Sequence, residues 1–583
     1  MKKDSVFARL IRFTKPHGFF LLAALVSALL GVTLSLLVPV LVGRGVDQLL
    51  GPGAVDFPAL ARILVALGAA VLASALFQWL VSLCTNRVAY RTIQDIRVAA
   101  FDRLSRVPLK YIDGHAHGDI MARVVTDVDQ ISDGLIQGFT QLFTGVVTIL
   151  GTIGFMLSIN YQIALVVVLV TPLSLFVAAF IGKRTHRYFA QQSATRGELG
   201  GYIEELVGNQ KVVKTFHYEQ RAQAAFEAIN ARLYDCGVKA QFYSSLTNPC
   251  TRFVNAVVYA AVGIFGAVLC VTGGLSIGQL TSFLSYANQY TKPFNEITGV
   301  VTELQTALAA AKRVFALMDE PPERSDADLP ALTQCDGSVT LSDVSFSYRE
   351  DVPLIEHLNL AAQPGQRIAI VGPTGCGKTT IINLLMRFYD VQRGEIRLGG
   401  TPITSITRGS LRRQYGMVLQ ESWLFSGTVR ENIAYGRPEA TEPEIIQAAK
   451  LAHAHGFIMR LEHGYDTLIT EDGGNISQGQ KQLLCIARIM LTHPPMLILD
   501  EATSSIDTRT ELRVQQAFDT MMRGRTSFVV AHRLSTIRQA DVILVMNSGR
   551  IVEQGNHQQL LARGGFYAQL YNSQFEPTES GEG

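Results

Sequence analysis

The sequence predicts two domains of different fold class: an α-helical membrane domain, followed by an α/β domain. Long runs without a charged residue fill the first half of the 583-residue chain. From about Ser338, short β-rich runs alternate with helical ones, which is typical of α/β folds. A glycine-rich loop at Gly372–Thr380 stands between an apolar strand and a helix. A charged fraction of 17% and a mean hydropathy of +0.21 agree with a large membrane-embedded share.

Four charge-free runs contain the membrane spans that we expect. They are Phe19–Gly43, Ile63–Asn86, Gly134–Gly182 and Phe253–Thr291. A helix needs about 20 apolar residues to cross a bilayer, so the first two runs hold one span each and the longer two hold two each. The long runs break at Asn160–Gln162 and at Gly273–Gly274, where we expect tight hairpins. The prediction is six transmembrane helices with both chain ends on one side.

Basic residues place that side in the cytoplasm. The segment between the second and third spans carries Arg87, Arg91, Arg97, Arg103, Arg106, Lys110 and Arg123. The segment between the fourth and fifth spans opens with Lys183, Arg184 and Arg187. The opposite loops are short and carry few charges, and Lys and Arg are enriched in cytoplasmic loops. We therefore expect a multi-pass protein of the cytoplasmic (inner) membrane, in contact with the lipid bilayer, with both termini and the α/β domain in the cytoplasm.

The cytoplasmic segments and a proline-containing linker set the domain boundaries. Both segments are expected to form helical hairpins, with tips near Asp113–Gly118 and Gly208–Gln210, where helix-breaking residues cluster. Three prolines then mark a linker between the domains. The predicted parts are the membrane domain with its cytoplasmic coupling helices at 1–320, the linker at 321–337, the α/β domain at 338–576 and a disordered tail at 577–583.

Charge and cysteine content exclude other classes of protein. The formal net charge is +2, and the absence of a basic patch argues against a nucleic-acid partner. The seven cysteines are scattered and form no C-x-x-C pair. This pattern predicts neither a disulfide framework nor a zinc site.

The glycine-rich loop matches the phosphate-binding pattern G-x-x-x-x-G-K-[ST]. Its residues are Gly372, Pro373, Thr374, Gly375, Cys376, Gly377, Lys378, Thr379 and Thr380. Glycines let backbone N–H groups point at phosphate oxygens, and the N-terminus of the following helix adds a positive dipole. Lys378 is expected to reach the β- and γ-phosphates, and the Thr379 hydroxyl to ligate Mg²⁺. Cys376 fits the loop as a small residue, and maleimide at its thiol should slow ATP hydrolysis.

A second apolar strand, Met496–Leu499, ends in two acidic residues. A continuous apolar run is typical of a strand that is buried on both faces of a sheet. Asp500 at its carboxyl end is expected to hold Mg²⁺ through its water shell, and Glu501 to accept a proton from the attacking water. Together with the phosphate loop, these residues predict an α/β P-loop NTPase that binds ATP and Mg²⁺.

Further motifs resemble those of ATP-binding cassette (ABC) proteins. The run Asn475–Gln482 is similar to the family signature, whose usual form is L-S-G-G-Q. Tyr348 resembles the aromatic residue that stacks on adenine, and Leu424–Ile433 resembles the exporter pattern after the Q-loop. Gly118–Arg123 and Glu204–Phe216 resemble the two coupling regions of the membrane domain. Six spans followed by one cassette resemble a multidrug- or lipid-type exporter half-transporter with the type IV ABC exporter fold.

The resemblance implies a nucleotide site that two chains share. It assigns catalytic roles to Glu501, His532 and Gln420, with Gln420 also close to Mg²⁺. It assigns contacts with the ATP of the other cassette to the signature residues Ser477, Gln478, Gly479 and Gln480, and a place in the D-loop to Asp507. Two cassettes then sandwich two ATP molecules, and hydrolysis drives the dimer between inward-open and outward-open states. The implied function is ATP-driven export.

One departure from the family pattern bears on the partner chain. Gln478 stands where the usual signature has its first glycine. A long amide there should weaken the site that this chain completes on its partner, whereas its own site keeps Lys378, Asp500, Glu501 and His532. Our hypothesis is that the chain is the catalytically competent half of a heterodimer with a second ABC half-transporter. A homodimer that tolerates the glutamine is the alternative.

The sequence leaves the substrate open. Polar and aromatic residues within the spans either line a cavity or serve helix packing and interface anchoring: Gln78, Trp79, Tyr286, Asn288, Gln289 and Tyr290. An apolar lining suits an amphipathic drug, a lipid or a peptide, so a lipid flippase is included. Two other classes are an ATP-gated channel or regulator, and a membrane-tethered ATPase that remodels DNA or protein. Glu501 argues against the channel, because gating requires only ATP binding.

Overall fold

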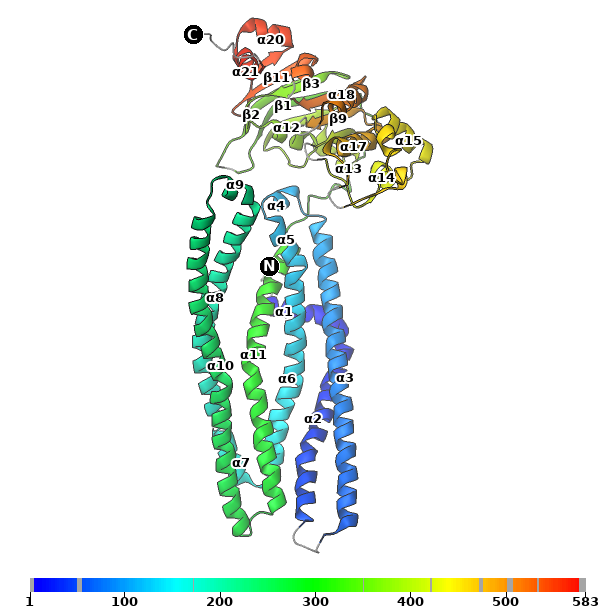
Figure 1. The fold of residues 1–583 in the computed structure, drawn as a ribbon. Coiled ribbons are helices and arrows are strands. Elements are labelled where there is room, and N and C mark those ends of the chain that lie inside the picture. The colour runs from blue at the N-terminus through cyan, green and yellow to red at the C-terminus, as the bar shows by residue number, and fades with distance from the viewer. Residues whose placement is uncertain are drawn as a thin grey trace. The chain divides into compact units, whose positions relative to one another are not determined.

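The computed structural model describes residues 5–49, 55–170, 172–349, 351–419, 422–470, 475–500, 507–531 and 534–575 (Figure 1). The chain divides into two compact units. The first unit comprises Met1–Val107 and Gly114–Pro321, and the second comprises Pro108–Asp113 and Pro322–Gly583.

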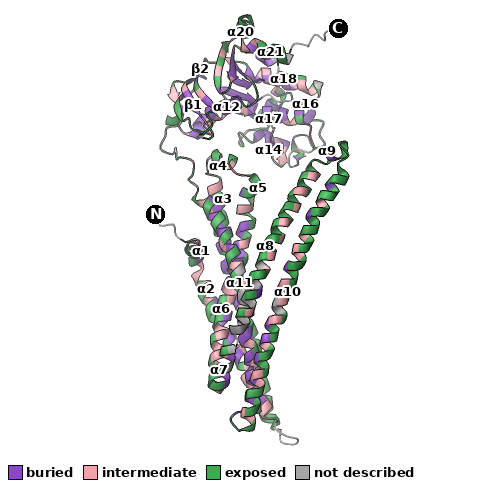
Figure 2. Ribbon diagram, turned by 90° about the vertical axis from the view of Figure 1, so that its left-hand side faces the viewer, coloured by how far each residue is buried: buried purple, intermediate pink, exposed green. Residues whose placement is uncertain are grey.

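The first unit is built from helices. They are α1 (Val6–Thr14), α2 (Gly18–Asp47), α3 (Phe57–Leu104), α5 (His117–Val124), α6 (Thr126–Ile159), α7 (Tyr161–Val170), α8 (Pro172–Gly208), α9 (Gln210–Thr215), α10 (Glu219–Val271) and α11 (Ile277–Asp319). The long helices run side by side, with α2 against α3, α6 against α11 and α8 against α10 (Figure 1). Much of their surface is exposed (Figure 2), and it includes large apolar side chains such as Val65 and Leu72, as expected where helices face lipid.

Four stretches of the described chain are long and apolar enough to cross a membrane. They are Val6–Asp47, Phe57–Leu104, His117–Ile159 and Glu219–Val271. The other two predicted spans lie on α7 and α8, which flank the undescribed residue 171, and on α11. The predicted hairpins are present: α6 ends before Asn160, whose side chain accepts a hydrogen bond from Gln162 N (2.9 Å), and α10 ends before Gly273, which has a φ of +80°.

Helices α2 and α11 are joined by polar contacts inside the first unit. The Tyr286 hydroxyl is fully buried and donates to the Leu36 backbone oxygen at 2.5 Å. Where α2 ends and α11 begins, Asp47 of α2 accepts hydrogen bonds from Gly278 N and Ser276 Oγ, both at 2.8 Å, and so caps α11. Tyr286 therefore packs α2 against α11 and, among the described residues, does not line a cavity.

The second unit contains two larger sheets. An antiparallel sheet has the order β2-β1-β4-β5, formed by β1 (Val339–Phe346), β2 (Ile355–Ala362), β4 (Arg393–Leu398) and β5 (Thr401–Pro402). The main sheet has the order β12-β11-β3-β10-β9-β6, formed by β3 (Arg367–Val371), β6 (Tyr415–Val418), β9 (Met496–Asp500), β10 (Thr526–Val530), β11 (Val542–Asn547) and β12 (Arg550–Gly555). The main sheet is parallel except for β12, which pairs antiparallel with β11. A short pair, β7 (Gly427–Thr428) and β8 (Leu468–Ile469), stands apart.

Helices cover the main sheet and bury its central strands, as Figure 2 shows. The helices of the second unit used below are α4 (Leu109–Asp113), α12 (Lys378–Leu385), α13 (Arg408–Arg413), α17 (Gln478–Thr492) and α18 (Thr508–Met522). The others are α14 (Val429–Ala434), α15 (Glu442–Leu451), α16 (His455–Ile458), α19 (Leu534–Arg538), α20 (His557–Arg563) and α21 (Phe566–Phe575). Strand residues such as Ile368, Ile498 and Phe528 are fully buried, which explains why these strands are apolar throughout.

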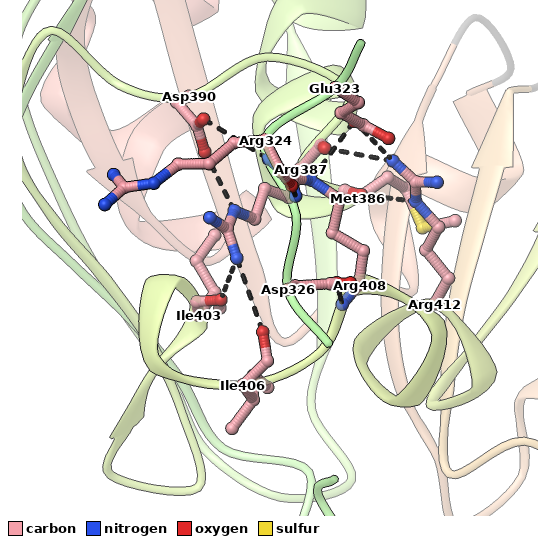
Figure 3. A network of polar contacts seen from close by, with 10 residues as sticks. All are labelled: Glu323, Arg324, Asp326, Met386, Arg387, Asp390, Ile403, Ile406, Arg408 and Arg412. Atoms are coloured by element: carbon pink, nitrogen blue, oxygen red, sulfur yellow. Dashed lines mark hydrogen bonds and ion pairs between the residues drawn. The ribbon is translucent and has the colours of Figure 1, made fainter. Parts of the chain in front are cut away.

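The segment that follows α11 is held on the second unit by a buried arginine (Figure 3). Arg408 Nη1 donates to the Arg324 backbone oxygen at 2.7 Å, and its Nε pairs with Glu323 Oε1 at 3.1 Å. The Arg408 backbone N–H donates to Asp326 Oδ2 at 2.5 Å. Three residues of the linker are thus bonded to one residue of α13, whose side chain is only 7% exposed.

A second arginine completes this network. Arg387 Nε donates to Asp390 Oδ1 at 2.8 Å, and the other carboxyl oxygen of Asp390 faces Arg408 Nη2 at 3.5 Å. Arg387 Nη1 also donates to the Ile403 backbone oxygen (2.9 Å). Because both guanidinium groups are buried, these contacts compensate charges that would otherwise be costly to remove from water.

Candidate functional site

The carboxyl edge of the main sheet brings two predicted site segments together. Ile370 of β3 and Asp500 of β9 both pair with Val530 of β10, which lies between them. Neighbouring strands are about 4.8 Å apart, so Asp500 and the start of the phosphate loop lie at the same level, about 10 Å apart. This spacing leaves room for phosphate groups above the intervening strand.

The phosphate loop has the backbone that its glycines predict. Gly375 and Gly377 have φ values of +81° and +100°, in the left-handed region that favours glycine, and Gly377 precedes the first residue of α12. Lys378 is buried, and its Nζ donates to the backbone oxygens of Gly372 (2.8 Å) and Pro373 (2.9 Å). The ammonium group therefore lies within the loop, where phosphate oxygens can replace these carbonyl partners.

Cys376 is a buried member of this loop. It is 4% exposed and packs in the apolar core together with residues of β2 and α12. Burial raises the pKa of its thiol, an effect that Lys378 partly opposes. Cys376 therefore packs as a small apolar residue, and its thiol is mostly protonated at neutral pH.

Oxygen donors that suit Mg²⁺ lie on both segments. Thr379 is exposed in the first turn of α12, whereas Thr380 is buried, and Asp500 is buried at the end of β9. Mg²⁺ is usually held by one or two protein oxygens together with substrate phosphates and water. Across the described ranges, no group of three or more His, Cys, Asp or Glu side chains converges. Thr379 and Asp500 thus offer the kind of oxygen donors that a nucleotide-bound Mg²⁺ takes from a protein.

Tyr348 is fixed at the surface beside α12. Its ring makes edge-to-face contacts with Phe346 and with Tyr389, both with centroids 5.0 Å apart. Asn383 Nδ2 of α12 donates to the Tyr348 hydroxyl at 2.9 Å. The residue is 39% exposed, so part of the ring remains available to a ligand.

Tyr389 is a residue that the sequence analysis missed. Its hydroxyl donates to Asp113 Oδ2 of α4 at 2.5 Å, and burial together with the Asp113 charge raises the pKa of Tyr389. Leu109 of the same short helix packs against the core of the second unit. Because the Tyr389 ring also packs edge-to-face on Tyr348, the contact with α4 lies next to the ring expected to stack on adenine. The partners are 276 residues apart, and neither belongs to a motif.

The signature segment forms the N-terminus of α17. Ser477 caps this helix: its Oγ accepts from Gln480 N at 3.3 Å, and the Gln480 side chain accepts from Ser477 N at 2.9 Å. Gly479 is buried, whereas Gln478 is exposed. Asp507 caps α18 in a similar way by accepting from Thr510 N at 2.9 Å, a bond that lowers the pKa of Asp507. Glu501, His532 and Gln420 lie outside the described residues.

Comparisons with known proteins cover both units. The family model for the ABC transporter transmembrane region matches residues 21–294, and the model for the ABC transporter matches residues 355–504. A "Fatty acid ABC transporter ATP-binding/permease protein" of Mycobacterium bovis is 44% identical over 526 residues, which cover 90% of this chain and 83% of that protein. An "ATP-dependent lipid A-core flippase" of Syntrophus aciditrophicus is 33% identical over 588 residues, covering 100% of this chain and 96% of the flippase. The solved structure of a bacterial Atm1-family ABC exporter with ATP bound has a TM-score of 0.79 and 30% identity, and covers 96% of this chain and 98% of that chain.

A helical membrane unit and a phosphate-loop cassette on one chain define a membrane ATPase of the transporter class. The chain belongs to the ABC transporter family and has the Atm1-like exporter fold. It is a multi-pass membrane protein with an ATP-binding cassette, and its ATPase is coupled to transport. The predictions of family, fold class and enzymatic activity are therefore confirmed.

Proposed function

We propose that this chain is one half of a dimeric exporter that uses ATP hydrolysis to move a lipid-type amphiphile, in the first instance a fatty acid, out of the cytoplasmic leaflet. The observation that carries the proposal is the 44% identity to a fatty acid ABC transporter across 90% of this chain. The similarity to a lipid A-core flippase over the whole chain supports the same class of substrate. A drug or a peptide, which the sequence leaves open, has no such support.

In this proposal, the described site residues bind the nucleotide. Lys378 exchanges its carbonyl partners for the β- and γ-phosphates, and Tyr348 stacks on adenine. Thr379 and Asp500 hold Mg²⁺, which when bound neutralises phosphate charge. Glu501 accepts the proton of the attacking water, with His532 and Gln420 beside the γ-phosphate.

The second cassette completes each site. Ser477 uses its oxygen as the helix cap, but its hydroxyl proton stays available for a γ-phosphate of the partner chain. ATP binding favours the closed pair of cassettes, because the nucleotide contacts both. Hydrolysis removes the γ-phosphate contacts and lets the pair reopen. The exposed Gln478 at this helix end favours a heterodimer, in which the altered signature serves only the partner's site.

Reconstitution in proteoliposomes tests this function. ATP should drive the movement of a fluorescent fatty acid between leaflets, measured by quenching from one side. Glu501→Gln should bind ATP and stop this movement, and Lys378→Ala should abolish ATP binding. ATP-dependent ion current without movement of the fatty acid would instead support the channel class. Normal turnover by Glu501→Gln would contradict its role as the base.

A further inference from the structure

An apolar hollow of about 280 Å³ lies between α6 and α11 of the membrane unit. Leu142, Val146 and Val301 contribute much of its wall, and each is at least 46% exposed. There is free space at Gly145, where an added methyl group would meet Gln141 and Pro293 only at an ordinary contact distance of 3.7 Å. Such a wall offers favourable burial to a hydrocarbon chain and nothing to a polar ligand.

A second hollow, of about 510 Å³, adjoins the apolar one and shares Gln141 and Val300 with it. Its remaining lining includes Asn86 of α3 and Gln137 of α6. Thr140 Oγ1 of α6 donates to Thr85 Oγ1 of α3 at 3.4 Å, so these two positions stand at the same height.

A third, open hollow of about 710 Å³ lies along one face of α3, which supplies its whole lining, and shares Ser82 and Asn86 with the second hollow. Arg87, Tyr90 and Arg91 line it. Within the described parts of the chain, no hydrogen bond or ion pair engages Arg87, and Arg91 contacts only the Phe20 ring, 5.4 Å from its centroid. Two guanidinium groups without a carboxylate partner give this end a positive charge.

The three hollows form a row with a charged end and an apolar end. The contact between Thr85 and Thr140 fixes one level that is common to α3 and α6. From that level, Arg91 lies about 9 Å along α3 towards its C-terminal end, at a rise of about 1.5 Å per residue. Ile149, at the apolar end, lies about 14 Å in the opposite direction along α6. The row is thus about 23 Å long, which matches an extended long-chain fatty acid.

We infer that this row binds an acidic amphiphile, with its carboxylate at Arg87 and Arg91 and its single acyl chain between α6 and α11. The inference rests on the proposed function and adds to it the charge of the headgroup and the place of the chain. Guanidinium groups bind carboxylates through paired charge-assisted hydrogen bonds, which an alcohol of equal length cannot form. Relative to the free acid in water, each methylene that enters the hollow should tighten binding about fourfold until the chain reaches Ile149.

Trp79 provides a direct probe of binding, because it lines the third hollow beside Arg87 and Arg91. The chain has only one other tryptophan, Trp423. The full-length Trp423→Phe variant, reconstituted with its partner, is titrated with a fatty acid brominated at mid-chain. The corresponding brominated alcohol controls for partition into the bilayer. We expect the acid to quench Trp79 at a concentration at least tenfold lower than the alcohol does, and Arg87→Gln to remove most of this preference. Arg87→Lys, which keeps the charge, should retain a clear preference.

Two matched variants separate binding from structural effects. Arg106→Gln also removes a cytoplasmic positive charge, but Arg106 pairs with Asp102 at 2.7 Å outside the row and should leave the preference unchanged. Val146→Trp should weaken binding of the long-chain acid about tenfold and leave a short-chain acid unaffected, because it fills only the apolar end. Basal ATPase activity should be normal in Arg106→Gln, which lies outside the row.

The outcomes distinguish this inference from the proposed function. Equal quenching by acid and alcohol, or an unchanged preference in Arg87→Gln, would overturn the inference even if the protein transports fatty acid. Selective quenching that depends on Arg87, without ATP-driven movement of the acid, would support the binding row and count against the proposed function.

Discussion

Lys378 shows how the phosphate loop is arranged before nucleotide arrives. Its ammonium group is held by two backbone oxygens of its own loop, so it is already close to the place that the phosphates should take. In the Lys378→Ala variant, thermal unfolding without nucleotide should change little, since those oxygens can bond to water. The rise in Tm that saturating ATP gives to the wild type should disappear, because binding at 100 times Kd contributes about 2.7 kcal/mol. Lys450→Ala, on an exposed helix of the same cassette, serves as the control in differential scanning fluorimetry. An ATP-dependent rise in Lys378→Ala would contradict the assignment.

Cys376 should react slowly with maleimide at neutral pH, and faster as the pH rises. The thiolate is the reacting form, and burial raises the thiol pKa, so the thiolate fraction at pH 7 is small and grows towards that raised pKa. Modification should slow ATP hydrolysis, since the thiol packs within the phosphate loop, and ATP should protect it. Labelling followed by mass spectrometry between pH 7 and 9 tests this, with Cys376→Ser as the unlabelled reference. Full activity after complete modification would show that the loop tolerates the adduct.

At the scale of elements, the linker is bonded to α13 along its length. Arg408→Ala should free it, because the change removes the contacts with Glu323, Arg324 and Asp390 together. Loss of one partner from a buried charge network typically costs about 3 kcal/mol. Hydrogen exchange of the full-length protein should therefore accelerate at Leu332, whose N–H donates to Ser410 Oγ at 2.9 Å in the same contact region. Arg349→Ala, which breaks only an exposed pair with Asp351, should leave the exchange of the linker unchanged.

The contact between α4 and the cassette also belongs to this scale. A double-mutant cycle with Tyr389→Phe and Asp113→Ala should give a coupling energy of about 1 kcal/mol, since Asp113 is exposed and its charge is screened. The measurement is denaturant unfolding of the full-length protein followed by cassette fluorescence. A coupling energy near zero would mean that the hydrogen bond contributes nothing to the docking of α4.

Sequence and structure agree where the signal is local. The phosphate loop, the strand before Asp500 and the breaks at Asn160 and Gly273 were predictable, because each depends on a few neighbouring residues with strong backbone preferences. The contact of Tyr389 with Asp113 and the packing of Tyr286 on Leu36 were not, since their partners are 276 and 250 residues apart. Nothing in the nearby sequence determines which of several polar groups a buried hydroxyl will find.

At the scale of the whole molecule, the membrane unit and the cassette are one chain, but the proposed site needs two. Each signature helix is proposed to serve the nucleotide of the other protomer, so Gln478 affects the partner's site and leaves the chain's own site intact. One subunit can therefore carry both a complete set of catalytic residues for its own site and an altered signature that affects only the partner's site.

This arrangement predicts unequal behaviour of the chain alone and in its pair. The reference is the complex that an affinity tag on this chain recovers from native membranes. Purified alone, the chain should hydrolyse ATP at less than a tenth of the rate of that complex, because no signature of the usual sequence then completes the chain's own nucleotide site. Gln478→Gly should raise the rate of the chain alone, since a glycine lets the backbone of α17 approach a phosphate that the long amide keeps at a distance. Within the complex, the same substitution should change the total rate little, because the main turnover occurs at this chain's own site, which the partner's signature completes. Light scattering identifies the species. A stable particle of twice the 63.7 kDa chain mass with a full ATPase rate, and no further gain from Gln478→Gly, would establish the homodimer instead.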